Sequence, residues 1–306
     1  MKAASVDSAS FQPSPANGSP ARNRFLLDFA ELVKARLTLL VLVTTAVGFY
    51  MGAKGEIDWF GLLHAFFGTA MAAAGAAALN QWWERAFDAQ MHRTQSRPIP
   101  GGRMMARNAL IIGTLLSLGG VLYLGRTCNY LSAVLAAVTI ALYIFAYTPL
   151  KRISTVNTLI GAIPGAIPPL IGWAAARNEL TLGAWSLFAI LFFWQMPHFF
   201  ALAWLYRVDY ARAGFQMVSS GDDSGARSSS QSVLFCLLLL MFAGFPFYLG
   251  LTSAVYLGIA LLLTCIFLAM AMQFHGKRNS VAARNLFLTS IIYLPLLLAA
   301  LVMTKR

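Results

Sequence analysis

The sequence predicts an all-α integral membrane protein with nine transmembrane helices. Hydrophobic residues make up 58% of the 306 residues, and the mean hydropathy is +0.67. Charged residues make up only 11%, whereas soluble domains contain roughly 25%. The apolar residues come in runs of about 20, the length at which a helix crosses a ~30 Å hydrocarbon core. This composition excludes a disordered chain, a disulfide scaffold and an ordinary soluble protein.

A polar tail precedes the predicted spans. Residues 1–22 are rich in Ser, Ala and Pro and lack the apolar segment of a signal peptide, so we expect a solvated, disordered tail. The rest of the chain, residues 23–306, is predicted to be one nine-span domain. The spans are expected near 29–52, 57–79, 105–125, 128–148, 156–176, 182–203, 231–250, 253–273 and 284–303. The turn between the seventh and eighth spans is expected at Gly250-Leu251-Thr252-Ser253.

Lys and Arg residues are divided unevenly between the two sides of these spans. With the N-terminus in the cytoplasm, 18 of the 23 fall on the inner side and 5 on the outer side. The positive-inside rule therefore favours an N-in, C-out topology. The net charge of +12 is carried in short loops beside apolar spans, where cations meet anionic headgroups. We expect membrane lipid, and not nucleic acid, as their partner.

The end of the second span carries three oxygen-bearing side chains at a spacing of four. Asn80, Glu84 and Asp88 fall within roughly 80° on one helical face and rise ~6 Å per step. Mg²⁺ binds one or two carboxylates and completes its shell with water and substrate phosphate oxygens. A solvated helix end is the alternative, but the helix dipole disfavours anions at a helix C-terminus. The pattern therefore favours a metal site.

Basic residues follow this acidic face. Arg93 and Arg97 carry planar guanidinium groups suited to phosphate oxygens, and a segment with two prolines and a glycine, 98–101, fixes the loop after them. Positive-inside anchoring explains either arginine alone, but not why cations follow the carboxylates so closely. The cluster favours a phosphate–metal–carboxylate site at one membrane face.

Two later segments place helix-breaking residues beside polar ones. In the segment 147–152, Pro149 is expected to break the fourth span, so that Lys151 and Arg152 project from a turn. Alone, this is ordinary juxtamembrane chemistry. The fifth span contains three prolines and three glycines within 161–173, which predicts a kinked, closely packed helix that lines a cavity.

The sixth span contains polar residues in apolar surroundings. Gln195 and His198 lie in the segment Trp194-Gln195-Met196-Pro197-His198-Phe199 and are expected to face the bundle interior. His198 could be a satisfied interior hydrogen-bonding residue, an acid–base group or a ligand of haem iron, and the sequence leaves these alternatives open.

Taken in order, these segments resemble the protohaem IX farnesyltransferases, or haem O synthases, of the UbiA-type superfamily of intramembrane prenyltransferases. The similarity covers roughly residues 25–300. It is carried by Asn80-x-x-x-Glu84-x-x-x-Asp88-x-x-Met91-x-Arg93-Thr94-x-x-Arg97-Pro98, Tyr147-Thr148-Pro149-Leu150-Lys151-Arg152, Gly161-x-x-x-Gly165-Ala166-x-Pro168-Pro169-x-x-Gly172-Trp173, Trp194-Gln195-Met196-Pro197-His198-Phe199 and Asp209-Tyr210. The segments 80–84 and 195–198 are typical of the haem branch rather than the quinone branch.

The resemblance implies a central cavity that opens to the cytoplasmic face. It implies transfer of the farnesyl group of farnesyl diphosphate to a vinyl group of haem B with addition of water, giving haem O and diphosphate for haem-copper terminal oxidases. Mg²⁺ is the implied cofactor, and a haem A synthase or the terminal oxidase assembly machinery is an implied partner. We expect a bacterial cytoplasmic (inner) membrane location, because the tail is a poor transit peptide.

The resemblance also assigns roles to particular residues. The metal ligands would be Asn80, Glu84, Asp88 and Asp209, the diphosphate ligands Arg93, Arg97, Lys151, Arg152 and Arg207, the residues of the prenyl and haem pocket Trp194, Gln195, His198 and Phe199, and the catalytic residues Asp88, Lys151, Tyr147 and His198. The loop 211–219 lacks both prolines that the family usually carries after Asp209-Tyr210. The shape of this loop and a second metal ion therefore do not follow from the resemblance.

Three alternatives stand beside this interpretation. A UbiA-type enzyme could act on a quinone-precursor aromatic acid. A secondary transporter usually places ionisable residues at broken helices near the midplane, whereas the polar clusters here lie at one face. A non-catalytic haem-binding assembly factor for terminal oxidases would keep His198 but would not need the carboxylates beside two arginines.

Overall fold

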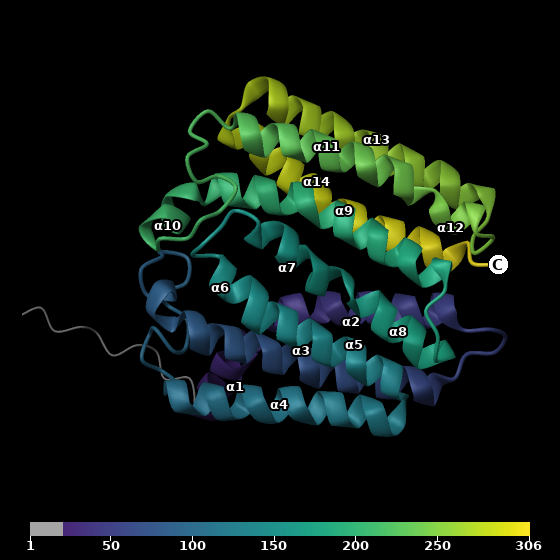
Figure 1. Cartoon of the computed structure of the whole chain (residues 1–306), viewed down its shortest axis with the longest axis horizontal. Helices are drawn as coiled ribbons and strands as arrows, with labels where there is room; N and C mark the ends of the chain where they lie inside the picture. The colour runs from purple at the N-terminus through teal and green to yellow at the C-terminus, as the bar shows by residue number, and fades with distance from the viewer. Residues whose placement is uncertain (1–20) are drawn as a thin grey trace, which may run out of the picture.

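Nine helical segments long and apolar enough to cross a membrane run side by side in the computed structural model, which describes residues 21–306 (Figure 1). They are α2 (Ala35–Gly52), α3 (Trp59–Asp88), α4 (Ala106–Thr127), α5 with η1 and α6 (Tyr130–Ala141, Leu142–Tyr147 and Thr148–Leu150), α7 with α8 (Asn157–Ala166 and Pro168–Arg177), α9 (Leu182–Leu205), α11 with α12 (Ala226–Ala243 and Phe245–Tyr248), α13 (Ala254–Lys277) and α14 (Ser280–Met303). Two short helices, α1 (Ala21–Leu32) and α10 (Arg207–Arg212), lie outside these segments.

The prediction of nine spans in an all-α fold is confirmed. The expected turn at 250–253 separates α12 from α13, with Gly250 at a positive φ of 74°. The main correction is to the first span, expected over 29–52: α1 ends at Leu32 and α2 begins at Ala35. Residues 1–20 of the predicted tail lie outside the described residues, and residues 21 and 22 begin α1.

The two ends of the bundle differ. The loop-rich end carries the connections 89–105, 151–156 and 206–225, whereas α12 and the C-terminus lie at the opposite end (Figure 1). Outward-facing positions carry large apolar side chains such as Leu115, Leu122 and Leu262, each more than 60% exposed. A hydrocarbon surrounding accounts for this exposure, because hydrogen bonds within the helices satisfy their backbone groups.

The centre of the bundle is α9. This helix packs against α7, α11 and α14, so it is enclosed on several sides. Its fully buried residues include Ile190, Phe200 and Ala201. Residues on different faces of this central helix therefore have different surroundings. These surroundings determine which residues of the segment 194–199 can line a cavity.

Two irregular helices shape the interior. The fourth span changes to a π-helix, η1, directly before Pro149 and ends only at Leu150. The helix therefore ends two residues beyond the expected bound of 148, because the wider π turn accommodates a ring that would otherwise meet the carbonyl four residues earlier. Lys151 and Arg152 lie in the turn that follows, as expected. The fifth span is interrupted at Ile167 between α7 and α8, as its prolines predict.

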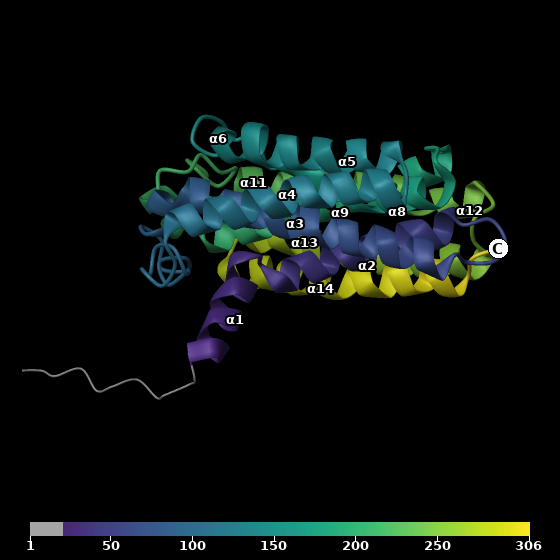
Figure 2. The ribbon, with the colours of Figure 1, turned by 90° about the horizontal axis from the view of Figure 1, so that it is seen from below.

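The short helix α1 diverges from the bundle at the loop-rich end (Figure 2). Its apolar residues Phe25, Leu26 and Leu27 are more than half exposed. Arg103, in the loop before α4, joins α1 to the bundle through Asp28 at 2.7 Å and Glu31 at 3.0 Å. An exposed apolar face beside basic residues is typical of a helix at a membrane interface.

Candidate active site

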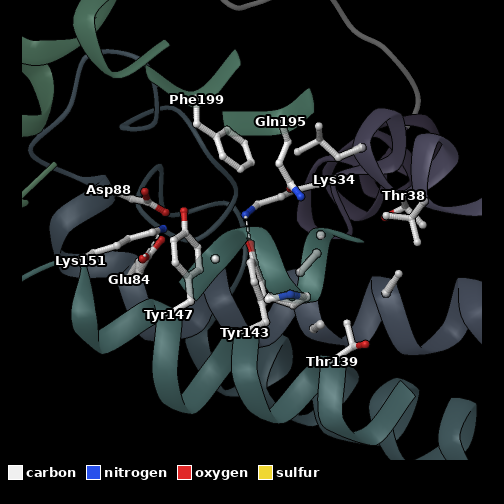
Figure 3. A pocket seen from close by; sticks show the side chains of 18 of the residues that line it. Lys34, Thr38, Glu84, Asp88, Thr139, Tyr143, Tyr147, Lys151, Gln195 and Phe199 are labelled. Atoms are coloured by element: carbon white, nitrogen blue, oxygen red, sulfur yellow. Dashed lines mark hydrogen bonds and ion pairs between the residues drawn. The ribbon is translucent and has the colours of Figure 1, made fainter. Parts of the chain in front are cut away.

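A cavity of about 430 Å³ lies between α2, α3, η1, α7 and α9. Its polar part is at the loop-rich end, where Glu84, Asp88 and Lys151 lie together (Figure 3). Its apolar part extends between the helices and reaches Thr38 and Thr139 (Figure 3). The predicted cavity is therefore present, and the kinked fifth span lines it with Gly161, Pro164, Gly165 and Pro168.

Two buried ion pairs form the polar part. Lys151 Nζ lies 2.7 Å from Glu84 Oε1, and Arg97 Nη1 lies 2.6 Å from Asp88 Oδ2. Burial alone would lower the pKa of Lys151, but the Glu84 carboxylate and its hydrogen bond outweigh burial and raise this pKa above its ordinary value. The ammonium of Lys151 therefore stays charged. Each carboxylate holds one cation at the lining of the cavity.

Lys34 lines the same cavity from the start of α2. Its Nζ donates to Asn80 Oδ1 at 2.7 Å. Burial, together with the positive charges of Arg97 and Lys151, lowers the pKa of Lys34 to about 7. With Lys34 and Arg93 included, four basic side chains and two carboxylates line the cavity. This excess of positive charge suits a multiply charged anion.

Asn80 does not take the position that its spacing predicts. Its side chain is fully buried, accepts from Lys34, and donates from Nδ2 to Thr148 Oγ1 at 3.1 Å. Glu84 and Asp88 reach the cavity, whereas the Asn80 oxygen is held by a lysine. Of the three predicted oxygen ligands on this face, the structure brings together the two carboxylates.

Aromatic rings separate the polar and apolar parts of the cavity. Tyr143 and Tyr147 both line it and stack on each other, with ring centroids 5.5 Å apart. The π-helical turn of η1 places these residues, four apart in sequence, one above the other. Lys151 Nζ lies 4.5 Å from the centre of the Tyr147 ring. A Cβ on Gly161 would overlap this ring, which explains why a glycine faces it.

The remaining predicted phosphate ligands divide into two groups. Arg93 lines the cavity and donates to the hydroxyl of Tyr210 at 3.3 Å. Arg152 instead packs on the Phe87 ring, 4.6 Å from its centre, and Arg207 packs on the Trp204 ring at 4.3 Å. These two side chains lie outside the cavity lining because an aromatic face on the neighbouring helix binds each guanidinium.

Asp209, predicted as a fourth metal ligand, also lies outside the cavity lining. It pairs with Arg212 at 3.3 Å within α10. Within residues 21–306, no group of three or more His, Cys, Asp and Glu side chains is arranged to hold a metal ion. The structure therefore does not bring Asp209 to Glu84 and Asp88.

The segment 194–199 divides between two faces of α9. Gln195 and Phe199 line the cavity, and Gln195 Nε2 donates to the Ala162 carbonyl at 2.8 Å. Trp194 and His198 face α14 instead: Trp194 Nε1 donates to the Ser290 carbonyl at 2.9 Å, and His198 Nδ1 lies 2.7 Å from Ser290 Oγ. The four residues were predicted to line a single pocket, but two of them line the cavity and the other two contact α14.

The cavity residues that the sequence prediction missed include Lys34 and Tyr143. Lys34 was assigned only to the cations of the inner side. A signal existed, because a lysine directly before a long apolar helix is opposed by the helix dipole, as a carboxylate is at a C-terminus. Tyr143 carried no comparable signal, since the π turn that directs it inward is not visible in the sequence.

A family comparison agrees with this geometry. The model of the UbiA prenyltransferase family matches residues 41–296. This chain belongs to that family. It is 43% identical to the protoheme IX farnesyltransferase of Solibacter usitatus over 287 residues, which cover 91% of this chain and 98% of that protein. It is 39% identical to the mitochondrial protoheme IX farnesyltransferase of Arabidopsis thaliana, covering 90% of this chain and 64% of that protein.

Solved structures of UbiA-type proteins have the same fold. A digeranylgeranylglyceryl phosphate synthase superposes with a TM-score of 0.77 at 16% identity, covering 92% of this chain and 98% of that one. A UbiA homologue from Archaeoglobus fulgidus bound to DMAPP and Mg²⁺ superposes with a TM-score of 0.64 at 12% identity, covering 90% of this chain and 99% of that one. At these identities the likeness concerns the fold alone, a multi-pass helical bundle.

The two cavity carboxylates of this UbiA family member fit a magnesium ion. Asp88 Oδ1 is buried and has no hydrogen-bond partner among the described residues. Glu84 supplies a second carboxylate on the same helical face. Mg²⁺ typically takes one or two carboxylates from the protein and fills its other positions with water and substrate phosphate oxygens. The donor set present here is of this kind.

Proposed function

We propose that this protein transfers the farnesyl group of farnesyl diphosphate to a vinyl group of haem B with addition of water, forming haem O and diphosphate. The observation that carries the proposal is the cavity, which joins a cationic polar end with two carboxylates to an apolar interior. This shape suits a diphosphate attached to an isoprenoid chain. The relatives named protoheme IX farnesyltransferase support the farnesyl donor and the haem acceptor.

The polar end would act on the diphosphate leaving group. Arg93, Arg97, Lys151 and Lys34 line the region in which negative charge develops as the bond from farnesyl C1 to oxygen breaks. Mg²⁺ held by Glu84 and Asp88 would supply further positive charge against the departing diphosphate. Arg97 and Lys151 are held in place by their ion pairs, so little rearrangement is needed when the anion binds.

The residues behind this end would protect the carbon that becomes cationic. Tyr147 and Phe199 present aromatic rings to the cavity, and such rings stabilise a neighbouring cation. Farnesyl C1 then bonds to the terminal vinyl carbon of haem B, and a water oxygen bonds to the inner vinyl carbon with loss of a proton. The apolar lining keeps water from capturing the farnesyl cation before the vinyl group does.

His198 is proposed to bind the iron of the haem substrate. With the hydroxyl proton of Ser290 directed to the Phe287 carbonyl at 2.5 Å, we assign the proton between Ser290 Oγ and His198 to Nδ1. The lone pair of Nε2 is then available, as in histidines that ligate metals. The imidazole packs against Phe287 with ring centroids 4.8 Å apart, and its neighbour Phe199 lines the cavity.

The transfer is tested with purified protein, haem B, farnesyl diphosphate and Mg²⁺, with products read by mass spectrometry. We expect a haem heavier by one farnesyl group and one hydroxyl group, and no product after treatment with EDTA. Asp88→Asn should lower turnover by about 100-fold or more, the scale seen when one preorganised charge-stabilising group is removed. Asp223→Asn, the same change at an exposed loop position, is the control. Near-normal turnover of Asp88→Asn at saturating Mg²⁺ would contradict the metal assignment.

The acceptor is tested in a parallel reaction with a quinone-precursor aromatic acid in place of haem B. Farnesylation of that acid with unmodified haem would retain the diphosphate site and overturn the haem assignment. The transporter and the non-catalytic assembly factor both predict no covalent product in either tube.

The iron ligand is tested by the absorption spectrum of ferric haem added without farnesyl diphosphate. The wild-type protein should show the Soret position of histidine-ligated haem, whereas His198→Ala should lose it and regain it on addition of imidazole. The same Soret spectrum in both proteins would remove His198 from the haem site.

A further inference from the structure

The apolar end of the cavity is closed by direct contact between α2 and α8. A Cβ on Gly48 would overlap the Pro169 carbonyl oxygen, and a Cβ on Gly172 would overlap that of Thr45, so the two backbones touch. Thr45 lies one turn beyond Val41, and Pro169 directly follows Pro168. Val41 and Pro168 are the last residues of their spans to line the cavity. The cavity therefore ends at this glycine crossing.

The depth of the cavity follows from the α3 residues that line it. Small residues, Ala77, Ala76 and Ala73, line the cavity beyond Glu84. Glu84 and Ala73 are eleven residues apart in one uninterrupted helix, which corresponds to about 16 Å at 1.5 Å per residue. Thr139 of α5 lines the cavity at its apolar end from the opposite wall (Figure 3).

This depth matches an isoprenoid chain of three units. A fully extended carbon chain advances about 1.25 Å per bond, so three isoprene units of four chain bonds each span about 15 Å. A fourth unit would need about 5 Å more, where the backbones of α2 and α8 are in contact. The cavity thus accommodates fifteen carbons beyond the diphosphate.

We propose that Ala73, together with Val41 and Thr139, closes the apolar end of the cavity as a floor and so limits the donor to a fifteen-carbon chain. The α3 residues that line the cavity then set the accepted chain length, and we call this arrangement the ruler. The proposal rests on the proposed function, because it assumes that the diphosphate binds beside Glu84 and Asp88. Ala77 lies one helical turn nearer to the polar end than Ala73, a step of about 6 Å or roughly one isoprene unit. Side chains enlarged at these two positions should shorten the accepted chain in steps.

The test is a competition among dimethylallyl, geranyl, farnesyl and geranylgeranyl diphosphates for the purified full-length protein. Binding of each diphosphate is measured by its displacement of labelled farnesyl diphosphate. Transfer to haem B is measured in parallel by mass spectrometry. Ala73→Leu should raise the preference for geranyl over farnesyl diphosphate at least ten-fold, and Ala77→Leu should move it further toward dimethylallyl diphosphate. Val41→Ala should not admit geranylgeranyl diphosphate, because the backbones of α2 and α8 are in contact beyond this side chain.

Ala74→Leu is the matched control. It makes the same change one residue along α3, at a half-buried position outside the cavity lining, and should leave the donor ranking unchanged. If Ala73→Leu fails to elute as a folded protein, Thr139→Leu introduces bulk from the opposite wall and should give the same shift. A donor ranking identical in the wild type, Ala73→Leu and Thr139→Leu would overturn the ruler.

The two readouts separate this proposal from the proposed function. A shifted binding preference without any transfer to haem B would retain the ruler and overturn the acceptor. Transfer to haem B with an unchanged donor ranking would retain the function and overturn the ruler.

Discussion

Lys34 places a positive charge at the N-terminus of α2, where the helix dipole opposes it. The residue adopts a left-handed backbone conformation with φ of 48°, which is uncommon for a non-glycine residue. Its ammonium is directed into the cavity beside the Tyr143 hydroxyl (Figure 3). It also donates to Asn80 Oδ1. These unfavourable features occur together at one position, and we infer from them a role for Lys34 in binding an anion.

We predict that Lys34→Gln weakens donor binding more than it slows the chemical step. Glutamine keeps a hydrogen-bond donor for Asn80 but removes the charge. The KM for farnesyl diphosphate should rise about 10-fold, the size expected for one hydrogen bond to a charged group, with a smaller change in kcat. Lys34→Arg should restore most of the loss. An unchanged KM in Lys34→Gln would limit Lys34 to its contact with Asn80.

The sequence predicts the chemistry of the site better than the position of each side chain. The spacing of Glu84 and Asp88 is a property of one helix, and both line the cavity as expected. Arg152 and Arg207 lie elsewhere because each is bound by an aromatic ring whose position depends on tertiary packing. His198 and Phe199 are neighbours in sequence, but about 100° of helical rotation separates them, and only the packed bundle shows which face meets the cavity.

At the scale of helices, the long apolar runs predict the existence of each span but not its irregularities. The first expected span ran across Glu31, Lys34 and Arg36, and the break between α1 and α2 lies among these charged residues. No distinctive residue marks the π turn η1 in the sequence, and Pro149 lies two residues beyond its end. These two irregularities place Lys34 and Tyr143 in the cavity, which explains why the sequence prediction missed both residues.

The position of α1 depends on Arg103, and this dependence gives a prediction about one element. Arg103 binds Asp28 and Glu31, and its Nη1 also donates to the Ser96 carbonyl at 2.8 Å. Arg103→Ala should release α1 and increase proteolytic cleavage near residues 24–27 several-fold, while the spans stay intact. Arg107→Ala removes an exposed cation from the start of α4 and serves as the control. Equal cleavage in the two variants would show that Gln81, which donates to the carbonyls of Glu31 and Leu32, anchors α1 without Arg103.

At the scale of the whole molecule, the nine spans place α1 and the C-terminus at opposite ends of the bundle (Figure 1). The C-terminus is held at its end by Lys305, whose Nζ donates to the carbonyls of Tyr50 and Ala53 at the end of α2. The cavity has its charged residues at the opposite end, beside the long loops. If that end faces the cytoplasm, the diphosphate site opens to the compartment in which soluble isoprenoid diphosphates and Mg²⁺ are available.

The orientation gives the last prediction. The excess of Lys and Arg on the loop-rich side predicts that this side is cytoplasmic. Glu56, in the loop between α2 and α3, and Asp223, in the loop before α11, are exposed at opposite ends. In a protein whose three cysteines are replaced, Glu56→Cys should react with a membrane-impermeant maleimide in intact bacterial cells from which the outer membrane has been removed. Asp223→Cys should react only after the membrane is permeabilised. The reverse pattern would place the cavity opening on the outer side, and equal labelling of both cysteines before permeabilisation would contradict a single orientation.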